Sequence, residues 1–227
     1  MLFHDRRHAG RLLAARLKLY VDRPEVLVLA LPRGGVVVAV EVAKALKAQL
    51  DVFVVRKLGV PGHEELGLGA VASGGVRTLN ESVIQDLRIP TEVIESISAS
   101  EWQELERRER IYRQRRPFPD VRERIVILVD DGIATGGTMR AAALALHRMR
   151  TKRTVIAVPV APLSTCVELK KLADEVVCIA MPELFYAIGQ WYEDFPQITD
   201  EQVAEMLERV AHGDNCSRAA VDVVSHC

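Results

Sequence analysis

The sequence predicts an α/β fold with a doubly wound, mostly parallel sheet of five strands, and three observations support this prediction. Five short apolar runs are rich in β-branched residues and do not alternate with polar residues, which is typical of strands covered on both faces. Stretches with helical patterns separate most of these runs, and strand–helix–strand repeats form right-handed crossovers in one parallel sheet. The 227 residues are 49% hydrophobic and 27% charged, the composition of an ordinary globular domain.

Each element follows from a local pattern along the chain. Strands are expected at Val26–Leu31, Val52–Arg56, Ile125–Val129, Thr154–Pro159 and Glu175–Ile179. Helices are expected at His4–Tyr20, Val36–Gln49, Thr91–Arg116, Gly137–Arg150 and Pro162–Ala173. The helix over Thr91–Arg116 is long and highly charged, because Glu and Arg side chains alternate there at three- and four-residue spacing. Gly67–Asn80 contains four glycines and predicts a β-hairpin or a mobile loop.

One domain should account for nearly the whole chain. We expect residues 1–213 to form it, with 91–116 as a helical insertion and 181–213 as a small hood followed by a C-terminal helix. Residues 214–227 show little periodicity and are expected to form a flexible tail.

Composition excludes several classes of protein. The 30 basic and 31 acidic residues give a net charge of −1, which argues against a chain-wide nucleic-acid or membrane surface. No apolar run approaches the roughly 20 residues that span a bilayer. Met1–Arg7 lacks an apolar signal core, so a cytoplasmic protein is expected. The four cysteines form no CxxC pair, which favours reduced thiols over zinc or disulfides.

The most informative segment is Val129–Thr138, VDDGIATGGT. An apolar strand ends in two carboxylates, Asp130 and Asp131, and a tight loop then opens a helix. Gly136 and Gly137 allow backbone N–H groups to approach a ligand closely, and the helix N-terminus adds a positive dipole end. The acids would repel a bare phosphate, so they should face hydroxyl groups or a metal on the same ligand. A sugar phosphate fits both halves, and acidic capping of a plain helix start is the alternative.

This segment closely resembles the phosphoribosyl pyrophosphate (PRPP) signature of the type I phosphoribosyltransferases. Pro32-Arg33-Gly34-Gly35, after the first strand, is similar to the pyrophosphate loop of that family. The resemblance implies that the 5′-phosphate binds Ala134, Thr135, Gly136, Gly137 and Thr138, and that Asp130 and Asp131 act as catalytic residues at the ribose. It implies a pyrophosphate site at Arg33, Gly34, Gly35, Arg56 and Lys57.

The resemblance also implies an activity. A Mg²⁺-dependent enzyme of nucleotide salvage would transfer the 5-phosphoribosyl group from PRPP to a small nitrogen acceptor, most simply a nucleobase, and release pyrophosphate. Mg²⁺ would be held mainly by PRPP and water, near Asp130 and Asp131. Gly59–Gly75 would correspond to a flexible loop that closes the site, with Glu65 as a candidate acid or base or an ordinary exposed carboxylate.

Departures from the family pattern leave the acceptor open. Ala134 stands where 6-oxopurine enzymes carry an aspartate, and the ATGGT variant is more like adenine and uracil enzymes. Met181–Pro196 holds five of the eleven aromatic residues and should form the hood, either stacking a base or packing as core. The helix over 91–116 would cap the site, build a homodimer or face nucleic acid, and its interspersed glutamates disfavour nucleic acid.

Two other functions remain possible on the same residues. A PRPP-sensing regulatory protein would keep the phosphate loop without turnover, but would need a basic nucleic-acid surface. A sugar-phosphate-binding protein with unrelated chemistry would not bind PRPP at all, because a fold does not determine a function.

Overall fold

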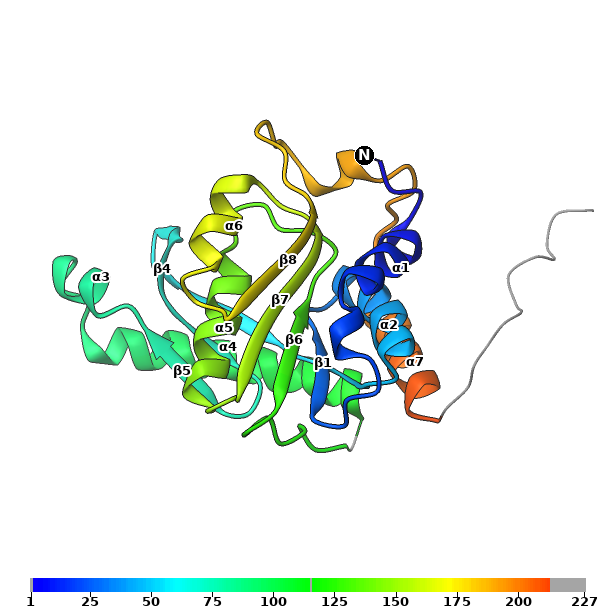
Figure 1. Cartoon of the computed structure of the whole chain (residues 1–227). Helices are drawn as coiled ribbons and strands as arrows, with labels where there is room; N and C mark the ends of the chain where they lie inside the picture. The colour runs from blue at the N-terminus through cyan, green and yellow to red at the C-terminus, as the bar shows by residue number, and fades with distance from the viewer. Residues whose placement is uncertain (1, 115, 213–227) are drawn as a thin grey trace, which may run out of the picture.

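The fold is built on a central parallel sheet with the strand order β2-β1-β6-β7-β8 (Figure 1). The computed structural model describes residues 2–114 and 116–212, without the side chains of residues 63–66. The five strands are β1 (Val26–Ala30), β2 (Gln49–Val52), β6 (Ile125–Val129), β7 (Arg153–Val160) and β8 (Glu175–Ala180). All neighbouring pairs are parallel. The predicted α/β class with five parallel strands is therefore confirmed.

The direction of winding reverses between β1 and β6. From β1 the chain continues outward to β2, whereas from β6 it proceeds through β7 to β8 on the other side. Three of the crossovers carry one helix each: α2 (Gly34–Leu46) after β1, α5 (Gly137–Arg148) after β6 and α6 (Leu163–Leu169) after β7. In sheets of this kind, ligands bind outside the carboxyl ends of the strands at the reversal point. The fold thus directs attention to the loops that follow β1 and β6.

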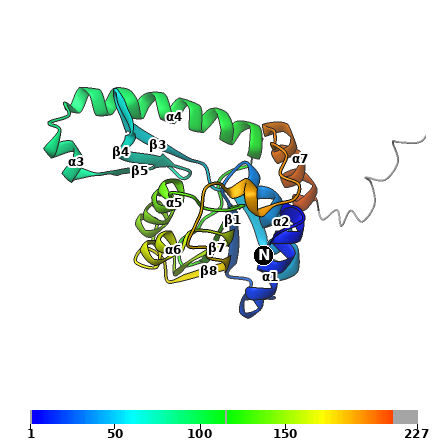
Figure 2. The same ribbon diagram turned by 90° about the horizontal axis from the view of Figure 1, so that it is seen from above.

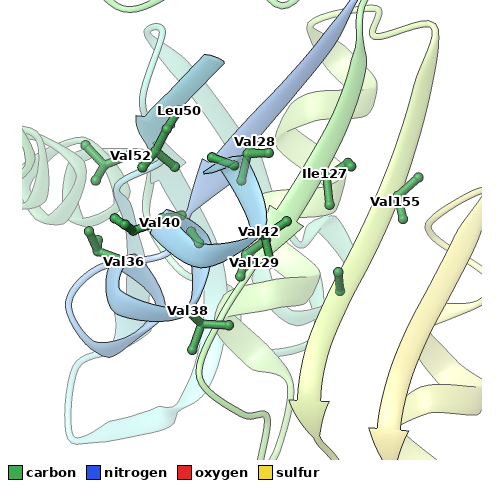
Figure 3. Packing of buried hydrophobic residues seen from close by; sticks show 14 of the residues in the cluster. Val28, Val36, Val38, Val40, Val42, Leu50, Val52, Ile127, Val129 and Val155 are labelled. Atoms are coloured by element: carbon green, nitrogen blue, oxygen red, sulfur yellow. The ribbon is translucent and has the colours of Figure 1, made fainter. Parts of the chain in front are cut away.

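Helices cover both faces of this sheet, as its uninterrupted apolar strands require. On one face, α2 packs with α1 (Arg6–Arg16) and α7 (Asp200–Ala211), while α5 and α6 cover the other (Figure 1). Alternate residues of β1 separate accordingly: Val28 joins the α2 side and Leu29 joins the α5 side. Figure 3 shows the valines of α2 near Val28 and Val129 of the sheet, with Ile127 and Val155 on the same face farther along it.

A second, antiparallel sheet has the order β3-β4-β5. Its strands are β3 (Val55–Val60), β4 (His63–Ala72) and β5 (Val76–Leu79). The long helix α4 (Thr91–Arg113) runs along this sheet and ends beside α7, and the short α3 (Glu81–Asp86) lies at its far end (Figure 2). Two short 3-10 helices, η1 (Lys18–Tyr20) and η2 (Ile188–Trp191), complete the described elements. The hairpin predicted over Gly67–Asn80 is therefore present as β4 and β5.

The second strand of the main sheet lies earlier in the chain than predicted. The pattern favours a helix through Gln49 and a strand over Val52–Arg56, but α2 ends at Leu46 and β2 already begins at Gln49. Lys47 terminates the helix in a left-handed conformation, with φ of 52°, and its N–H donates to the Ala43 and Lys44 carbonyls. This position usually holds glycine, so the sequence carries no stop signal there.

The long helix and a C-terminal helix are both present. The long helix is present over Thr91–Arg113, three residues shorter at its C-terminal end than expected. A C-terminal helix is present within 181–213 as α7, whereas the tail at 214–227 lies outside the described residues. None of the helices in the described part of the chain combines the length and apolar character that crossing a membrane requires.

Candidate functional site

The loop between β6 and α5 leads into a helix N-terminus, a kind of position that suits an anion. Gly136, the residue before the helix, has a φ of 76°, a left-handed conformation that favours glycine. No side chain in the described part of the chain caps this helix end, so its first N–H groups are available to a ligand. Thr135 and Thr138 are exposed and can add hydroxyl donors. The predicted phosphate-binding residues 134–138 therefore form one continuous concave loop.

Two side chains hold this loop from behind. The Thr165 hydroxyl, on α6, donates to the Ala134 carbonyl at 3.1 Å. The Arg140 Nη2 donates to the Thr135 carbonyl at 2.9 Å, and the same guanidinium forms an ion pair with Glu168 on α6. Side chains of α6 and α5 thus hold the loop through its carbonyl groups. The backbone N–H groups of the loop take no part in these bonds.

Glycines in the loop after β1 allow it to pack directly on the two aspartates. A Cβ placed on Gly34 would lie 1.9 Å from the Asp131 Oδ2, and one on Gly35 would lie 2.9 Å from the Asp130 Cα. Contacts below 3.0 Å do not occur between real Cβ atoms and such neighbours. The structure therefore brings Gly34, Gly35, Asp130 and Asp131 together at the reversal point between β1 and β6.

The two carboxylates of this site have different surroundings. The Asp131 N–H donates to the Asp130 Oδ1 at 2.8 Å, and Asp130 lines the cavity described below. Burial, and then the neighbouring charge of Asp131, raise the pKa of Asp130 well above its usual value. The Asp131 Oδ2 instead accepts a hydrogen bond from Arg6 Nε at 2.7 Å, and both side chains are buried. Asp130 therefore borders the cavity, whereas Asp131 is held by a cation.

Sequence patterns did not identify Arg6 as part of this site. It lies on α1, 125 residues before Asp131, and sequence periodicity marked α1 only as an amphipathic helix. Its only local signal is a charged residue on the buried side of that helix, where a partner of opposite charge is needed.

The two basic residues of β3 point in opposite directions because side chains alternate along a strand. The Arg56 Nε donates to the Glu101 Oε2 of α4 at 2.6 Å, so this side chain is directed away from the phosphate loop. Lys57 faces the loop: a Cβ placed on Gly137 would lie 2.7 Å from the Lys57 Nζ. The structure thus brings Lys57 to the start of α5, beside the phosphate cradle, and does not bring Arg56 there.

Arg33 and Glu65 are the remaining predicted residues. Arg33 is exposed and precedes α2, and among the described residues it has no ion-pair partner. Burial, and then Asp200, raise the pKa of the Tyr112 hydroxyl. The charge of Arg33 lies close enough to oppose this shift by a smaller amount. Glu65 belongs to β4 by its backbone, but its side chain lies outside the described part of the structure.

A cavity of about 210 Å³ lies over the phosphate loop. Its wall consists of Asp130, Gly132, Ile133, Ala134, Thr135, Gly136, Gly137, Thr138, Met139 and Ile188. Ile188, in η2, comes from the predicted hood: a Cβ on Gly132 would lie 2.6 Å from its Cγ2. Of the hood's aromatic residues, Tyr192 is buried against Phe3, whereas Tyr186 is 79% exposed. The hood segment therefore covers the cavity with an aliphatic side chain and packs part of its aromatic set as core.

The donor set suits a magnesium ion held mainly by a phosphorylated ligand and water. Among the described residues, no group of three or more His, Cys, Asp or Glu side chains is placed to hold a metal ion. Of the residues that line the cavity, Asp130 alone offers a carboxylate, and the Asp131 Oδ2 is engaged by Arg6. Mg²⁺ commonly binds one or two carboxylates together with substrate phosphates and several waters, which matches this arrangement.

The chain matches one protein family over more than half of its length. The sequence profile of the family described as "Phosphoribosyl transferase domain" matches residues 63–195, more than half of the chain. The matched region includes strand β4, which pairs with the strand that carries Lys57, the whole β6–α5 loop and the hood segment.

Two kinds of relative agree with this match. Two Mycobacterium tuberculosis proteins, named "Putative phosphoribosyl transferase MT0597" and "Putative phosphoribosyl transferase Rv0571c", are each 44% identical over 224 residues. The alignment covers 99% of this chain and 50% of each relative, so the chain spans about half their length. The crystal structure of TT1426 from Thermus thermophilus is 44% identical, with a TM-score of 0.81, over 91% of this chain and 98% of that one.

Proposed function

Because the chain belongs to the phosphoribosyl transferase domain family, we propose that it transfers the 5-phosphoribosyl group of PRPP to a nitrogen acceptor and releases pyrophosphate. One observation carries the proposal: the two motif loops, which follow different strands, meet at the reversal point of the sheet. One loop ends in a helix N-terminus suited to a phosphate, and the other brings two glycines against the paired acids. A phosphorylated sugar with a second anionic group would use both loops.

Each loop takes one part of the donor in this proposal. The 5′-phosphate binds the backbone N–H groups at the start of α5, with hydroxyl donors from Thr135 and Thr138. The Lys57 ammonium lies beside the same helix start and adds a positive charge to the anion there. The pyrophosphate extends toward Gly34 and Gly35, and the exposed Arg33, directly before them in the chain, is the candidate cation for it.

The acids and the metal act on the ribose. Bound Mg²⁺ would supply charge neutralisation to the departing pyrophosphate. Asp130 borders the cavity and orients the ribose hydroxyls, so the anomeric carbon faces the space under Ile188. As positive charge develops on the ribose ring, the nearby carboxylates stabilise it electrostatically. Arg6 keeps Asp131 in place during this step.

The acceptor enters from the hood side of the cavity. Ile188 and Ile133 offer apolar faces there, which suits a flat heterocycle such as a nucleobase. Ala134 supplies no side-chain acceptor at the loop, so ring recognition would come from backbone groups or from the hood. Nucleotide salvage in the cytoplasm is the corresponding biological role.

A turnover assay with a panel of acceptors tests this function. The purified chain is incubated with PRPP, Mg²⁺ and adenine, guanine, hypoxanthine, uracil or xanthine, and released pyrophosphate is measured. Pyrophosphate release that depends on one acceptor, with formation of the matching nucleotide, supports the proposal. Saturable PRPP binding without turnover for any acceptor would favour the regulatory alternative, and absence of PRPP binding would refute both.

A further inference from the structure

Arg6 makes several contacts that are not explained by phosphate binding or by the roles proposed for Asp130 and Asp131. Its Nε donates to the Asp131 Oδ2 at 2.7 Å and its Nη1 donates to the Pro196 carbonyl at 2.7 Å. Its guanidinium carbon lies 3.7 Å from the centre of the Phe195 ring. The Arg6 side chain is only 8% exposed. It joins Asp131, in the loop after β6, to Phe195 and Pro196 at the end of the hood segment.

Backbone hydrogen bonds make the hood segment and the start of the chain a single unit. The Phe3 N–H donates to the Trp191 carbonyl at 2.7 Å, and the Glu193 N–H returns to the Phe3 carbonyl at 2.8 Å. The Asp194 N–H donates to the His4 carbonyl at 2.9 Å. These bonds join residues 3–6 to residues 191–196, and we call the two segments together the terminal clasp.

The terminal clasp reaches the signature loop at two points. The Tyr192 hydroxyl donates to the Asp131 carbonyl, while Arg6 holds the carboxylate of the same residue. Directly before the clasp, η2 carries Ile188 over Gly132 and the cavity. Ile188 lies in the same short helix as the clasp residue Trp191, three residues before it.

We propose that Arg6 is a positioning residue that ties the terminal clasp to Asp131, and thereby fixes both the signature acid and the hood over the acceptor cavity. The ligand-binding part of this inference rests on the proposed function, whereas the mechanical part concerns the protein alone. A neutral residue in place of Arg6 would leave the negative charge of Asp131 without a compensating positive charge. Because this charge lies beside a site built for an anion, the change should weaken PRPP binding.

The guanidinium group is required for this role in three ways. Its planar fork donates to the carboxylate and to the Pro196 carbonyl at the same time, and its face stacks on Phe195. A lysine would keep the charge near Asp131 but would lose the fork and the stacking. Replacement by lysine therefore separates the electrostatic contribution from the mechanical one.

Calorimetric titration with PRPP and Mg²⁺ tests the electrostatic part in R6Q, R6K, D131N and the R6Q/D131N double variant. Losing one charge-assisted contact should lower the PRPP affinity of R6Q by about tenfold or more, with R6K closer to wild type. In the D131N background the R6Q change should have a much smaller effect, because the charge to be compensated is already gone. Equal effects of R6Q in both backgrounds would overturn the proposal.

The matched control is R7Q, on the next residue of α1. The Arg7 side chain is 59% exposed and its contact with Glu41 is long, at 3.8 Å. We expect R7Q to bind PRPP as wild type does. A loss in R7Q equal to that in R6Q would mean that the charge of α1, and not the Arg6 contact, determines affinity, and would overturn the proposal.

Tryptophan fluorescence tests the mechanical part without any ligand. The sequence has two tryptophans, so in a W102F background the emission reports Trp191 alone, within the terminal clasp. Both R6Q and R6K should shift this emission to longer wavelength and speed amide hydrogen exchange over 191–196, whereas R7Q should not. Unchanged emission and exchange in folded R6Q and R6K would refute the clasp. If wild type fails to bind PRPP, the proposed function fails and this second measurement still decides the role of Arg6.

Discussion

Replacing Gly35 by alanine tests how closely the loop after β1 packs against the acids after β6. The added Cβ would lie 2.9 Å from the Asp130 Cα and 3.0 Å from the Val129 carbonyl oxygen. Both are backbone atoms, so no side-chain rotation can relieve the contact. The two loops must separate by several tenths of an ångström for the alanine to fit.

Two opposing effects determine whether G35A is less or more stable than wild type. Gly35 lies in the first turn of α2 with an ordinary helical φ, so alanine alone would stabilise the helix by up to about 1 kcal/mol. Overpacking a tight contact costs about 1–3 kcal/mol. Subtracting the helix gain leaves a net loss of up to about 2 kcal/mol, which lowers the Tm by up to about 8 °C for a chain of this size.

Activity should fall more steeply than stability. Separating the loops displaces Asp130 from its position at the cavity, and a misplacement near 1 Å can reduce turnover by about a hundredfold. Thermal unfolding, PRPP calorimetry and pyrophosphate release on G35A measure these effects. For thermal unfolding alone, G67A is the matched control, because a Cβ at Gly67 would meet no described atom within 4 Å and its φ is not left-handed. A Tm of G35A at or above that of wild type, with normal turnover, would refute the close packing of the two loops.

Four further substitutions give distinct expectations. D131N keeps the shape of the Asp131 side chain but removes its charge, so turnover of the folded variant should fall by about a hundredfold or more; wild-type turnover would remove Asp131 from the site. K57M should weaken PRPP binding by about tenfold or more and flatten its salt dependence, whereas R56M should leave calorimetric affinity unchanged, because Arg56 is engaged by Glu101. T165V removes the hydroxyl that supports the Ala134 carbonyl and should cost about 1 kcal/mol in urea unfolding, with a weaker PRPP affinity; an unaffected affinity would show that the loop needs no support from α6.

The main features of the fold and the site could be predicted from the sequence because they are local. The Asp130 and Asp131 pair, the glycines after it and the Pro32–Gly35 turn each lie within a few residues of the strand that positions them. Apolar strands without alternation identified a parallel sheet covered on both faces, and a sheet of that class binds ligands at the carboxyl ends of its strands. The order of motifs along the chain was sufficient to place both loops at one edge.

Features that depend on tertiary contacts could not be predicted. Arg6 and Asp131 are 125 residues apart, and only the packing of α1 against the sheet brings them together. The pair Arg56 and Lys57 could not be divided between the two faces because the sequence did not show that they belong to a separate antiparallel sheet. The early start of β2 depends on Lys47 adopting a left-handed conformation, which a lysine does not signal.

Calorimetric titration of the wild-type chain with PRPP, in the presence of Mg²⁺ and again after chelation by EDTA, tests the central claim most directly. We expect one saturable site that weakens strongly without the metal and is competed by ribose 5-phosphate, which shares the phosphate held at the start of α5. A folded protein that gives no binding heat with PRPP and Mg²⁺, or one whose binding ignores ribose 5-phosphate, would contradict it.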